Sequence, residues 1–238
     1  MTDKQLKKLV GNYQPNQKVL AGMANIQILG TVGPSASGKT TLMKALVKAL
    51  PKFKFILDET SRAPRPGEIN GQDFLFRTKE EILADLKKGE LVQIAIGPNG
   101  DLYSTRLSSY PPGGFGVIAL VPSAVKEFRR LPIKSFVAAF IVPYKFAVWQ
   151  GWLAKQAKAG GWTEKKLQSR LAEAKKSHEF ALADKNIIFV LNDDIDKAAA
   201  RLLQIADGQP PNDEIQARTI AEENYAKLLK LLNESSNL

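Results

Sequence analysis

Short apolar runs alternate with amphipathic stretches along most of the chain. Apolar runs rich in β-branched residues predict buried strands, and they lie at 26–32, 53–57, 116–121, 135–142 and 186–191. Apolar residues at helical spacing predict helices at about 40–50, 78–88, 123–130, 144–158, 163–182 and 194–206. Strands that alternate with helices are typical of a parallel sheet covered on both faces. We therefore predict an α/β fold of three layers around a central parallel sheet.

Residues 60–115 break this alternation. They contain Pro/Gly turns and short strand-like runs, DFLF (73–76) and LVQIAI (91–96), which predict a small mixed α+β insert that binds the substrate. The whole chain then divides into a helix and linker at 1–24, a main domain at 25–206, and a tail at 207–238. In the tail, GQPPN (208–212) predicts a hinge before an amphipathic helix at about 213–233.

Composition narrows the possible partners. The chain has 238 residues with 34 Lys and Arg against 24 Asp and Glu, a net charge of +10 that favours anionic ligands such as nucleotides. The basic residues are dispersed, so a nucleic-acid groove is not indicated. The absence of cysteine excludes disulfides, thiolate zinc sites and cysteine nucleophiles. No apolar run approaches the length of a membrane span, so we expect a soluble, cytoplasmic protein.

GPSASGKTT (33–41) matches the phosphate-loop pattern G-x-x-x-x-G-K-[ST] between a predicted strand and a predicted helix. Gly33 and Gly38 permit the tight turn, in which backbone N–H groups and the helix N-terminus hold phosphate oxygens. Lys39 is expected to reach the β- and γ-phosphates, and Thr40 to bind Mg²⁺. The predicted ATP site also includes Ser35, Ser37 and Thr41. The chain lacks the Asn-Lys-x-Asp guanine reader of GTPases.

SRAPRPGE (61–68) places two arginines three residues apart on a proline-rich stretch. Such a stretch tends toward polyproline II, which has three residues per turn, so Arg62 and Arg65 point to the same side. Two planar guanidinium groups on a stiff backbone suit one phosphate. By itself the pair is also compatible with a solvated basic loop.

The longer stretch TSRAPRPGEINGQDFLF (60–76) resembles the signature of guanylate kinases, Thr-Thr-Arg-x-Pro-Arg-x-Gly-Glu-x-x-Gly-x-Asp-Tyr-x-Phe. The resemblance extends over roughly 26–206 and includes the phosphate loop, YST (103–105), RLAEAKKSHEF (170–180) and LNDDIDKA (191–198). It implies a P-loop fold with a helical lid at about 144–170, and transfer of phosphate from ATP to GMP with Mg²⁺. In the lid, Lys155 and Lys158 could replace the family's arginines.

The same resemblance implies roles for individual residues. Lys39 and Arg170 would be catalytic, with Arg170 bridging the transferred phosphoryl group, and Asn192 would contact the adenine of ATP. Arg62 and Arg65 would hold the acceptor phosphate. The remaining acceptor positions implied are Asp58, Phe74, Gln93 and Tyr103.

Several of these positions depart from the family pattern. Phe74 replaces a tyrosine that contacts the acceptor phosphate, Asp58 replaces the serine that reads guanine O6, and Gln93 replaces the glutamate that accepts from guanine N–H groups. A carboxylate offers only acceptors, so Asp58 would suit an exocyclic amine better than O6. The pocket has either been rebuilt for another base or shifted slightly while still accepting GMP.

Other departures concern the neighbouring strands. The family's Leu-Asp-x-Asp strand falls at VIALV, with Ala119 and Val121 at the aspartate positions, and its second tyrosine corresponds to Leu102 or to Tyr103. These losses keep two alternatives open: a kinase for another phosphorylated acceptor, and a non-catalytic guanylate-kinase-like binding module. We expect ATP and a nucleoside monophosphate as ligands, no membrane or nucleic-acid partner, and a monomer or homodimer.

Overall fold

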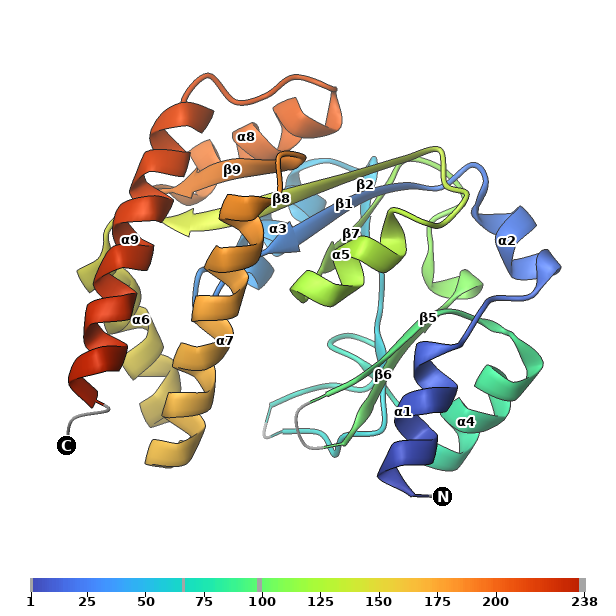
Figure 1. The fold of residues 1–238 in the computed structure, drawn as a ribbon. Helices are drawn as coiled ribbons and strands as arrows, with labels where there is room; N and C mark the ends of the chain where they lie inside the picture. Colours follow the sequence, from blue (N-terminus) through green and yellow to red (C-terminus); the bar gives the residue numbers. More distant parts are fainter. Residues whose placement is uncertain (1, 66, 98–99, 236–238) are drawn as a thin grey trace. The chain divides into compact units, whose positions relative to one another are not determined.

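The fold is that of a computed structural model (Figure 1), which describes residues 2–65, 67–97 and 100–235. The helices are α1 (Asp3–Gly11), α2 (Gln17–Met23), α3 (Lys39–Ala49), α4 (Lys79–Lys88), α5 (Pro122–Phe128), α6 (Phe146–Ala159), α7 (Glu164–Ala183), α8 (Ile195–Ala206), α9 (Glu214–Ser235) and the short 3₁₀ helix η1 (Leu107–Ser109). The strands are β1 (Gln27–Val32), β2 (Phe53–Phe55), β3 (Glu59–Thr60), β4 (Leu75–Phe76), β5 (Leu91–Ile96), β6 (Leu102–Arg106), β7 (Phe115–Ala119), β8 (Ser135–Pro143) and β9 (Ile187–Asn192).

The strands predicted from apolar runs form a five-stranded parallel sheet in the order β2-β7-β1-β8-β9. β2 pairs in parallel with β7, and β8 with β9 over six residue pairs from Ala138–Ile187 to Pro143–Asn192. Strands β1, β8 and β9 are almost entirely buried, as expected of parallel strands with both faces covered. The predicted α/β architecture is therefore confirmed. Because β1 is central, the loop that follows it leaves the middle of the sheet.

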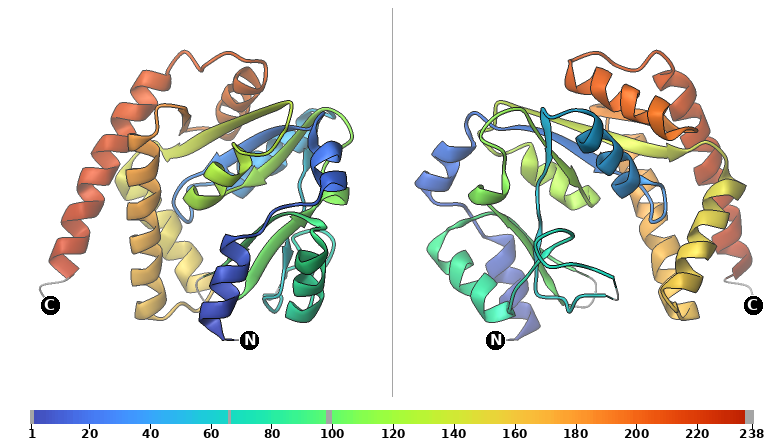
Figure 2. Two further views of the ribbon diagram at one scale, coloured as in Figure 1. Left: turned by 45° about the vertical axis from the view of Figure 1, so that its right-hand side comes forward. Right: turned by 180° about the vertical axis from the view of Figure 1, so that it is seen from behind.

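The chain divides into two compact units, and each is described by itself. One unit comprises residues 29–51, 119–125 and 137–238. In this unit α7 lies beside α9, α6 contacts α9, and α3 packs with α8 (Figures 1 and 2). Trp149, Leu153, Leu171 and Leu228 from these helices form one buried cluster. We call this part the phosphate-loop unit because it contains residues 33–41.

The other unit comprises residues 1–28, 52–118 and 126–136. It contains a second sheet of order β4-β3-β6-β5, in which β3 is parallel to β4 and antiparallel to β6. Helices α1 and α4 lie beside one face of β5 and β6 (Figure 2). Leu6, Ile82 and Leu86 from these helices pack there against Leu91 and Leu102. We call this part the acceptor unit because it contains the residues predicted to bind the acceptor.

The N-terminal region forms two helices rather than the single predicted one. Pro15 cannot donate a helical hydrogen bond, and Asn16 starts α2 by accepting from the Val19 N–H. The helix α1 is part of the acceptor unit's core: the Tyr13 hydroxyl, just after it, bonds both the N–H and the carbonyl of Leu91. Within the described residues, no helix is long and apolar enough to cross a bilayer.

Candidate active site

The phosphate loop has the geometry that its sequence predicts. Gly38 caps α3 in the left-handed conformation, with φ of 92°. A side chain at this position would be strained by the positive φ, and its Cβ atom would lie 2.4 Å from the Asn192 amide nitrogen, so Asn192 would have to move. Ala36 also has a positive φ, 62°, and is the only non-glycine residue in the described ranges that does. The loop is therefore a tight turn that leads directly into the N-terminus of α3, where anions bind favourably.

Lys39 lies inside this turn. Its ammonium group donates to the carbonyl oxygens of Gly33 and Pro34, both at 2.8 Å. The side chain is partly accessible to solvent, but protein atoms surround the ammonium group. This desolvation, with a smaller contribution from the positive charge of Arg170, lowers the pKa of Lys39 to about 8. A phosphate would relieve both effects, so the environment favours an anion beside Lys39.

Arg170, on α7, is the second cation predicted for this site. Its guanidinium group pairs with Glu173 at 2.5 Å and lies 5.6 Å from the centre of the Trp162 ring. The Arg170 Nε atom is buried and has no hydrogen-bond partner among the described residues. Lys39 and Arg170 are thus brought close enough to interact electrostatically, as the sequence-based assignment of both to catalysis requires.

Two distant residues brace the phosphate loop. The indole of Trp149, on α6, is buried and donates to the Ser35 carbonyl at 2.8 Å. The Asn192 side chain, at the end of β9, donates to the Ser37 carbonyl at 2.9 Å. Asn192, which the resemblance assigns to the adenine of ATP, is buried, and its amide nitrogen holds the loop. Neither contact has a local sequence signal, because the partners are 114 and 155 residues apart.

Thr40 and Thr41 lie at the first turn of α3 and are both exposed. A hydroxyl oxygen is a hard ligand that suits Mg²⁺, and Mg²⁺ in nucleotide sites takes its other ligands from phosphates and water. No group of three or more His, Cys, Asp or Glu side chains able to hold a metal occurs in the described part of the chain. Thr40 therefore fits a metal that arrives with the nucleotide, as its position in the motif predicts.

In the acceptor unit, the four-stranded sheet has two unlike faces. Side chains alternate between faces along a strand, and the strand register pairs Thr60 with Tyr103 and Phe76, and Gln93 with Thr105. Extending it by one residue places Asp58 beside Phe74 and opposite Thr105. These side chains share the face opposite to the one covered by α1 and α4, which we call the open face. Of the predicted acceptor residues, Asp58, Phe74, Gln93 and Tyr103 lie on it.

Tyr103, rather than Leu102, lies with the other predicted acceptor residues. Leu102 is fully buried on the helix-covered face. The Tyr103 ring contacts Phe74 edge to face at a centroid distance of 6.2 Å, and its hydroxyl contributes to raising the pKa of Arg62. Strand alternation therefore places Tyr103, and not Leu102, on the same face as Asp58 and Phe74.

Arg62 is held in place by a residue of the same motif. Its two terminal nitrogens bond the two carboxylate oxygens of Glu68 at 2.8 and 2.9 Å, and its guanidinium lies over the Phe74 and Phe76 rings. Glu68 also accepts from the Arg65 backbone N–H. The Glu68 carboxylate therefore occupies both terminal nitrogens of Arg62, the two donors that could instead bind two oxygens of a phosphate. The Arg65 side chain is exposed.

Asp58 has a different environment from the arginine pair. Its carboxyl group has no hydrogen bond or ion pair within residues 2–65, 67–97 and 100–235, although its backbone carbonyl continues the sheet by accepting from Leu75. Part of the residue is accessible, but the loss of solvent around the carboxyl raises its pKa to about 7. Neighbouring Tyr110 is buried and shares a 2.7 Å hydrogen bond with Thr105.

The side chain of Glu59, the next residue, lies on the helix-covered face and is paired with two arginines. It pairs with Arg77 at 3.0 Å and with Arg106, and both arginines also pair with Asp85, at 2.6 and 2.8 Å. Ser104 donates to it as well. This buried network fixes the strand that carries Asp58, and the sequence gives no signal for it beyond the charges themselves.

The remaining positions singled out by sequence lie outside these clusters. Val121 is 57% exposed, Ala119 is exposed at the end of β7, and Lys155 and Lys158 are exposed on α6. The single histidine, His178, is buried and bonded to the Ala174 carbonyl. Burial lowers its pKa.

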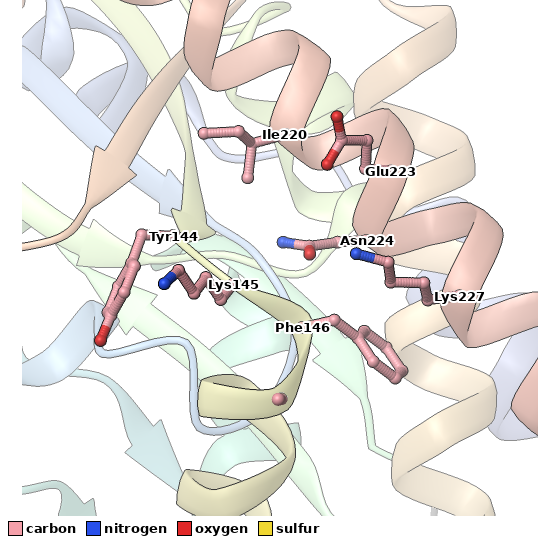
Figure 3. A pocket seen from close by; sticks show the side chains of 8 residues that line it. Tyr144, Lys145, Phe146, Ile220, Glu223, Asn224 and Lys227 are labelled. Atoms are coloured by element: carbon pink, nitrogen blue, oxygen red, sulfur yellow. The ribbon is translucent and has the colours of Figure 1, made fainter.

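A separate hollow of about 330 Å³ lies between the end of β8 and α9 (Figure 3). Lys145 and Phe146 approach it from the strand end, and Glu223 and Lys227 from the helix. The Asn224 side chain, also on its wall, bonds the Pro143 carbonyl and so serves the packing of α9. None of the predicted site residues lines this hollow.

Comparison with known proteins places this geometry in context. The family model described as "Guanylate kinase" matches residues 26–208. A guanylate kinase from Rubrobacter xylanophilus is 33% identical over 178 residues, covering 73% of this chain and 89% of the relative. One from Sus scrofa is 31% identical over 175 residues, covering 70% and 84%.

A solved structure agrees with the fold. The crystal structure of guanylate kinase from Anaplasma phagocytophilum covers 81% of this chain and 89% of its own, with a TM-score of 0.55 and 19% identity. At that identity the likeness concerns the fold, while the family model and the sequence relatives establish kinship. The chain therefore belongs to the guanylate kinase family, a family of nucleoside-monophosphate kinases.

Proposed function

We propose that this protein transfers the γ-phosphoryl group of ATP to a nucleoside monophosphate. The observation that carries the proposal is the phosphate loop, whose Lys39 is desolvated, has a lowered pKa and lies near a second cation, Arg170. Phosphoryl transfer needs positioning and neutralisation of charge rather than a protein nucleophile. The site supplies these two things.

At the donor end, the loop's backbone N–H groups and the N-terminus of α3 would hold the phosphates of ATP. Lys39 would exchange its two backbone carbonyl partners for phosphate oxygens, and Arg170 would neutralise the charge on the group being transferred. Thr40 would hold Mg²⁺, which on binding supplies positive charge to the β- and γ-phosphates. Ser35, Ser37, Thr41 and Asn192 would complete the ATP site.

At the acceptor end, Arg62 would hold the phosphate of the acceptor with support from Arg65. The relatives named guanylate kinase favour GMP as that acceptor. Phe74 cannot donate a hydrogen bond, so Tyr103 would provide the hydroxyl on this face. The polar side chains farther along the open face, Asp58 and Gln93, would meet the base.

Two other functions remain candidates on specific observations. The departures at Asp58 and Gln93 keep open a kinase for another phosphorylated acceptor, because the Arg62 fork reads a phosphate and not a base. The second candidate function is that of a non-catalytic binding module. The complete phosphate loop argues against it, because a module that only captured an acceptor would have no use for a desolvated Lys39.

The test is formation of ADP from ATP in the presence of each nucleoside monophosphate in turn, using the full chain. We expect turnover with at least one of them, and GMP is the first candidate. Replacing Lys39 with methionine should reduce turnover at least about 100-fold, because it removes a positioned charge from the transferred group. Absence of turnover with every nucleoside monophosphate would overturn the proposal.

The matched control is Lys48→Met. Lys48 is exposed on the same helix, in its last turn, and should have no role in phosphate binding. Both variants remove one positive charge from α3, so only a local role of Lys39 predicts a difference between them. Equal losses in the two would mean that net charge, not the phosphate loop, controls activity.

A further inference from the structure

Asp58 is the one feature of the open face that the proposed function leaves unexplained. A carboxylate accepts hydrogen bonds but cannot donate them. Guanine offers a carbonyl oxygen beside its N1–H group, so an ionised Asp58 would repel the base that the family kinship favours. If the acceptor is GMP, the Asp58 side chain must be able to donate a hydrogen bond to the guanine carbonyl.

Among the described residues, no cation pairs with the Asp58 carboxyl. On the open face its neighbours are Phe74 from β4, Thr105 from β6 and, one strand farther, Gln93 from β5, none of which is charged. Tyr110 is near enough for the Asp58 charge to affect it, but burial raises the pKa of this phenol, so it stays neutral. The nearest arginines in sequence are paired with other carboxylates: Arg62, which lies over the Phe74 ring, with Glu68, and Arg77 with Glu59 and Asp85.

A carboxyl group in such a place tends to take up a proton rather than remain charged. The pKa of about 7 agrees with this environment. A neutral carboxylic acid has an O–H donor, and enzymes do keep acids neutral in apolar sites so that they can donate. The protonated side chain would then offer the donor that a serine hydroxyl offers.

We propose that Asp58 determines the base of the acceptor, and that its neutral acid form donates a hydrogen bond to the ring carbonyl oxygen of a 6-oxopurine. Gln93 has both an acceptor and a donor, so its carbonyl oxygen can accept from the base's adjacent N–H groups. The ionised form of Asp58 instead favours a base with an exocyclic amine. This inference rests on the proposed function, because it places the base on the open face beyond Arg62.

The position fits an acceptor that is anionic at one end. Asp58 and Arg62 are four residues apart, so their Cα atoms are at most about 14 Å apart along an extended chain. On the open face Phe74 and Thr105 flank Asp58, Gln93 lies beyond Thr105, and the Arg62 guanidinium lies over the rings of Phe74 and Phe76. A base attached to a phosphate at Arg62 would therefore be within reach of Asp58 and Gln93.

The experiment measures the KM for GMP, and its equilibrium Kd without ATP, from pH 5.5 to 8.5. For the wild-type protein we expect the Kd to rise about tenfold between pH 6 and pH 8, as the acid loses its proton around pH 7. The matched variant is Asp58→Asn, which has the same shape and an amide donor at every pH. Because GMP's own phosphate also titrates, the quantity compared is the difference between the two proteins.

Each outcome either supports or contradicts the proposed role of Asp58 in reading the base. A steeper rise in wild type than in Asp58→Asn supports the inference, and a weaker or inverted rise for AMP supports it further. Identical profiles in the two proteins would overturn it while leaving the kinase proposal intact. Tighter binding of AMP or CMP than of GMP at pH 6 would also overturn it. If no monophosphate is turned over, the proposed function fails, and the Kd profiles still show whether Asp58 reads the base.

Discussion

At the scale of single residues, two adjacent carboxylates show how strongly their surroundings decide their chemistry. Glu59 is fully buried and paired with two arginines, whereas Asp58 is partly exposed and unpaired in the described structure. A buried ion pair is strongly disrupted by the loss of one partner. An unpaired carboxylate in a desolvated site instead lowers the stability of the folded protein. A residue that lowers stability in this way suits a role in ligand binding better than a role in folding.

Asp58→Asn should therefore stabilise the protein at pH 8. The native pKa of Asp58, about 7, lies above its ordinary value of 3.8. The native state thus binds more protons than the unfolded state between these values, and the contribution of Asp58 to stability falls as the pH rises from about 4 to 7. Allowing for partial solvent access, we expect the variant to gain at least about 1 kcal/mol at pH 8, or about 2–4 °C in Tm, and almost nothing near pH 4.

Thermal unfolding of both proteins at several pH values measures this. Glu59→Gln provides the contrast, because it breaks a buried network and should cost about 3–5 kcal/mol at pH 7. A wild-type protein as stable as Asp58→Asn at pH 8 would show that the carboxyl group is not desolvated. Since unfolding needs no substrate, the result is independent of the assignment of function.

At the scale of elements, the phosphate loop depends on α6 as much as on its own sequence. The Trp149 indole holds the Ser35 carbonyl just before Ala36, whose positive φ is unfavourable for a residue with a Cβ atom. Without that bond the turn would be free to relax. Trp149 acts on the nucleotide only through the loop and is a positioning residue.

Trp149→Phe should therefore weaken ATP binding more than it slows catalysis. The loss of one buried hydrogen bond costs about 1 kcal/mol, which corresponds to about a fivefold rise in the KM for ATP, with kcat changed less than twofold. Steady-state kinetics with varied ATP checks this. Trp152→Phe is the control, because Trp152 is less buried and lies one turn along the same helix. Equal effects of both variants would mean that α6 acts through general packing.

Sequence patterns predicted the parts of the molecule that have a local signal. The buried strands β1, β8 and β9 are apolar and β-branched, and the phosphate loop has a fixed spacing. The strand β3 has two residues, Glu59 and Thr60, and so shows no periodicity. The contacts of Trp149, Asn192 and Glu59 join residues far apart in the chain, and such pairs cannot be found from spacing alone.

At the scale of the whole molecule, net charge is a property that the sequence does determine. A charge of +10 attracts anionic ligands from a distance, and both proposed substrates are anions. The basic residues are dispersed along the chain, so their combined effect would be on encounter rather than on bound geometry. Salt screens charges more than about 10 Å apart at 0.1 M ionic strength, which separates this effect from the short contacts of Lys39 and Arg62.

Raising KCl from 50 to 500 mM should lower kcat/KM for the acceptor about tenfold, while kcat changes little, because screening slows encounter but leaves desolvated contacts intact. The measurement is initial rate against acceptor concentration at constant free Mg²⁺ and saturating ATP. Repeating it with tetramethylammonium chloride separates screening from a specific effect of potassium. A kcat/KM that does not respond to salt would mean that the dispersed basic residues serve another purpose, and nucleic-acid binding would then need to be measured directly.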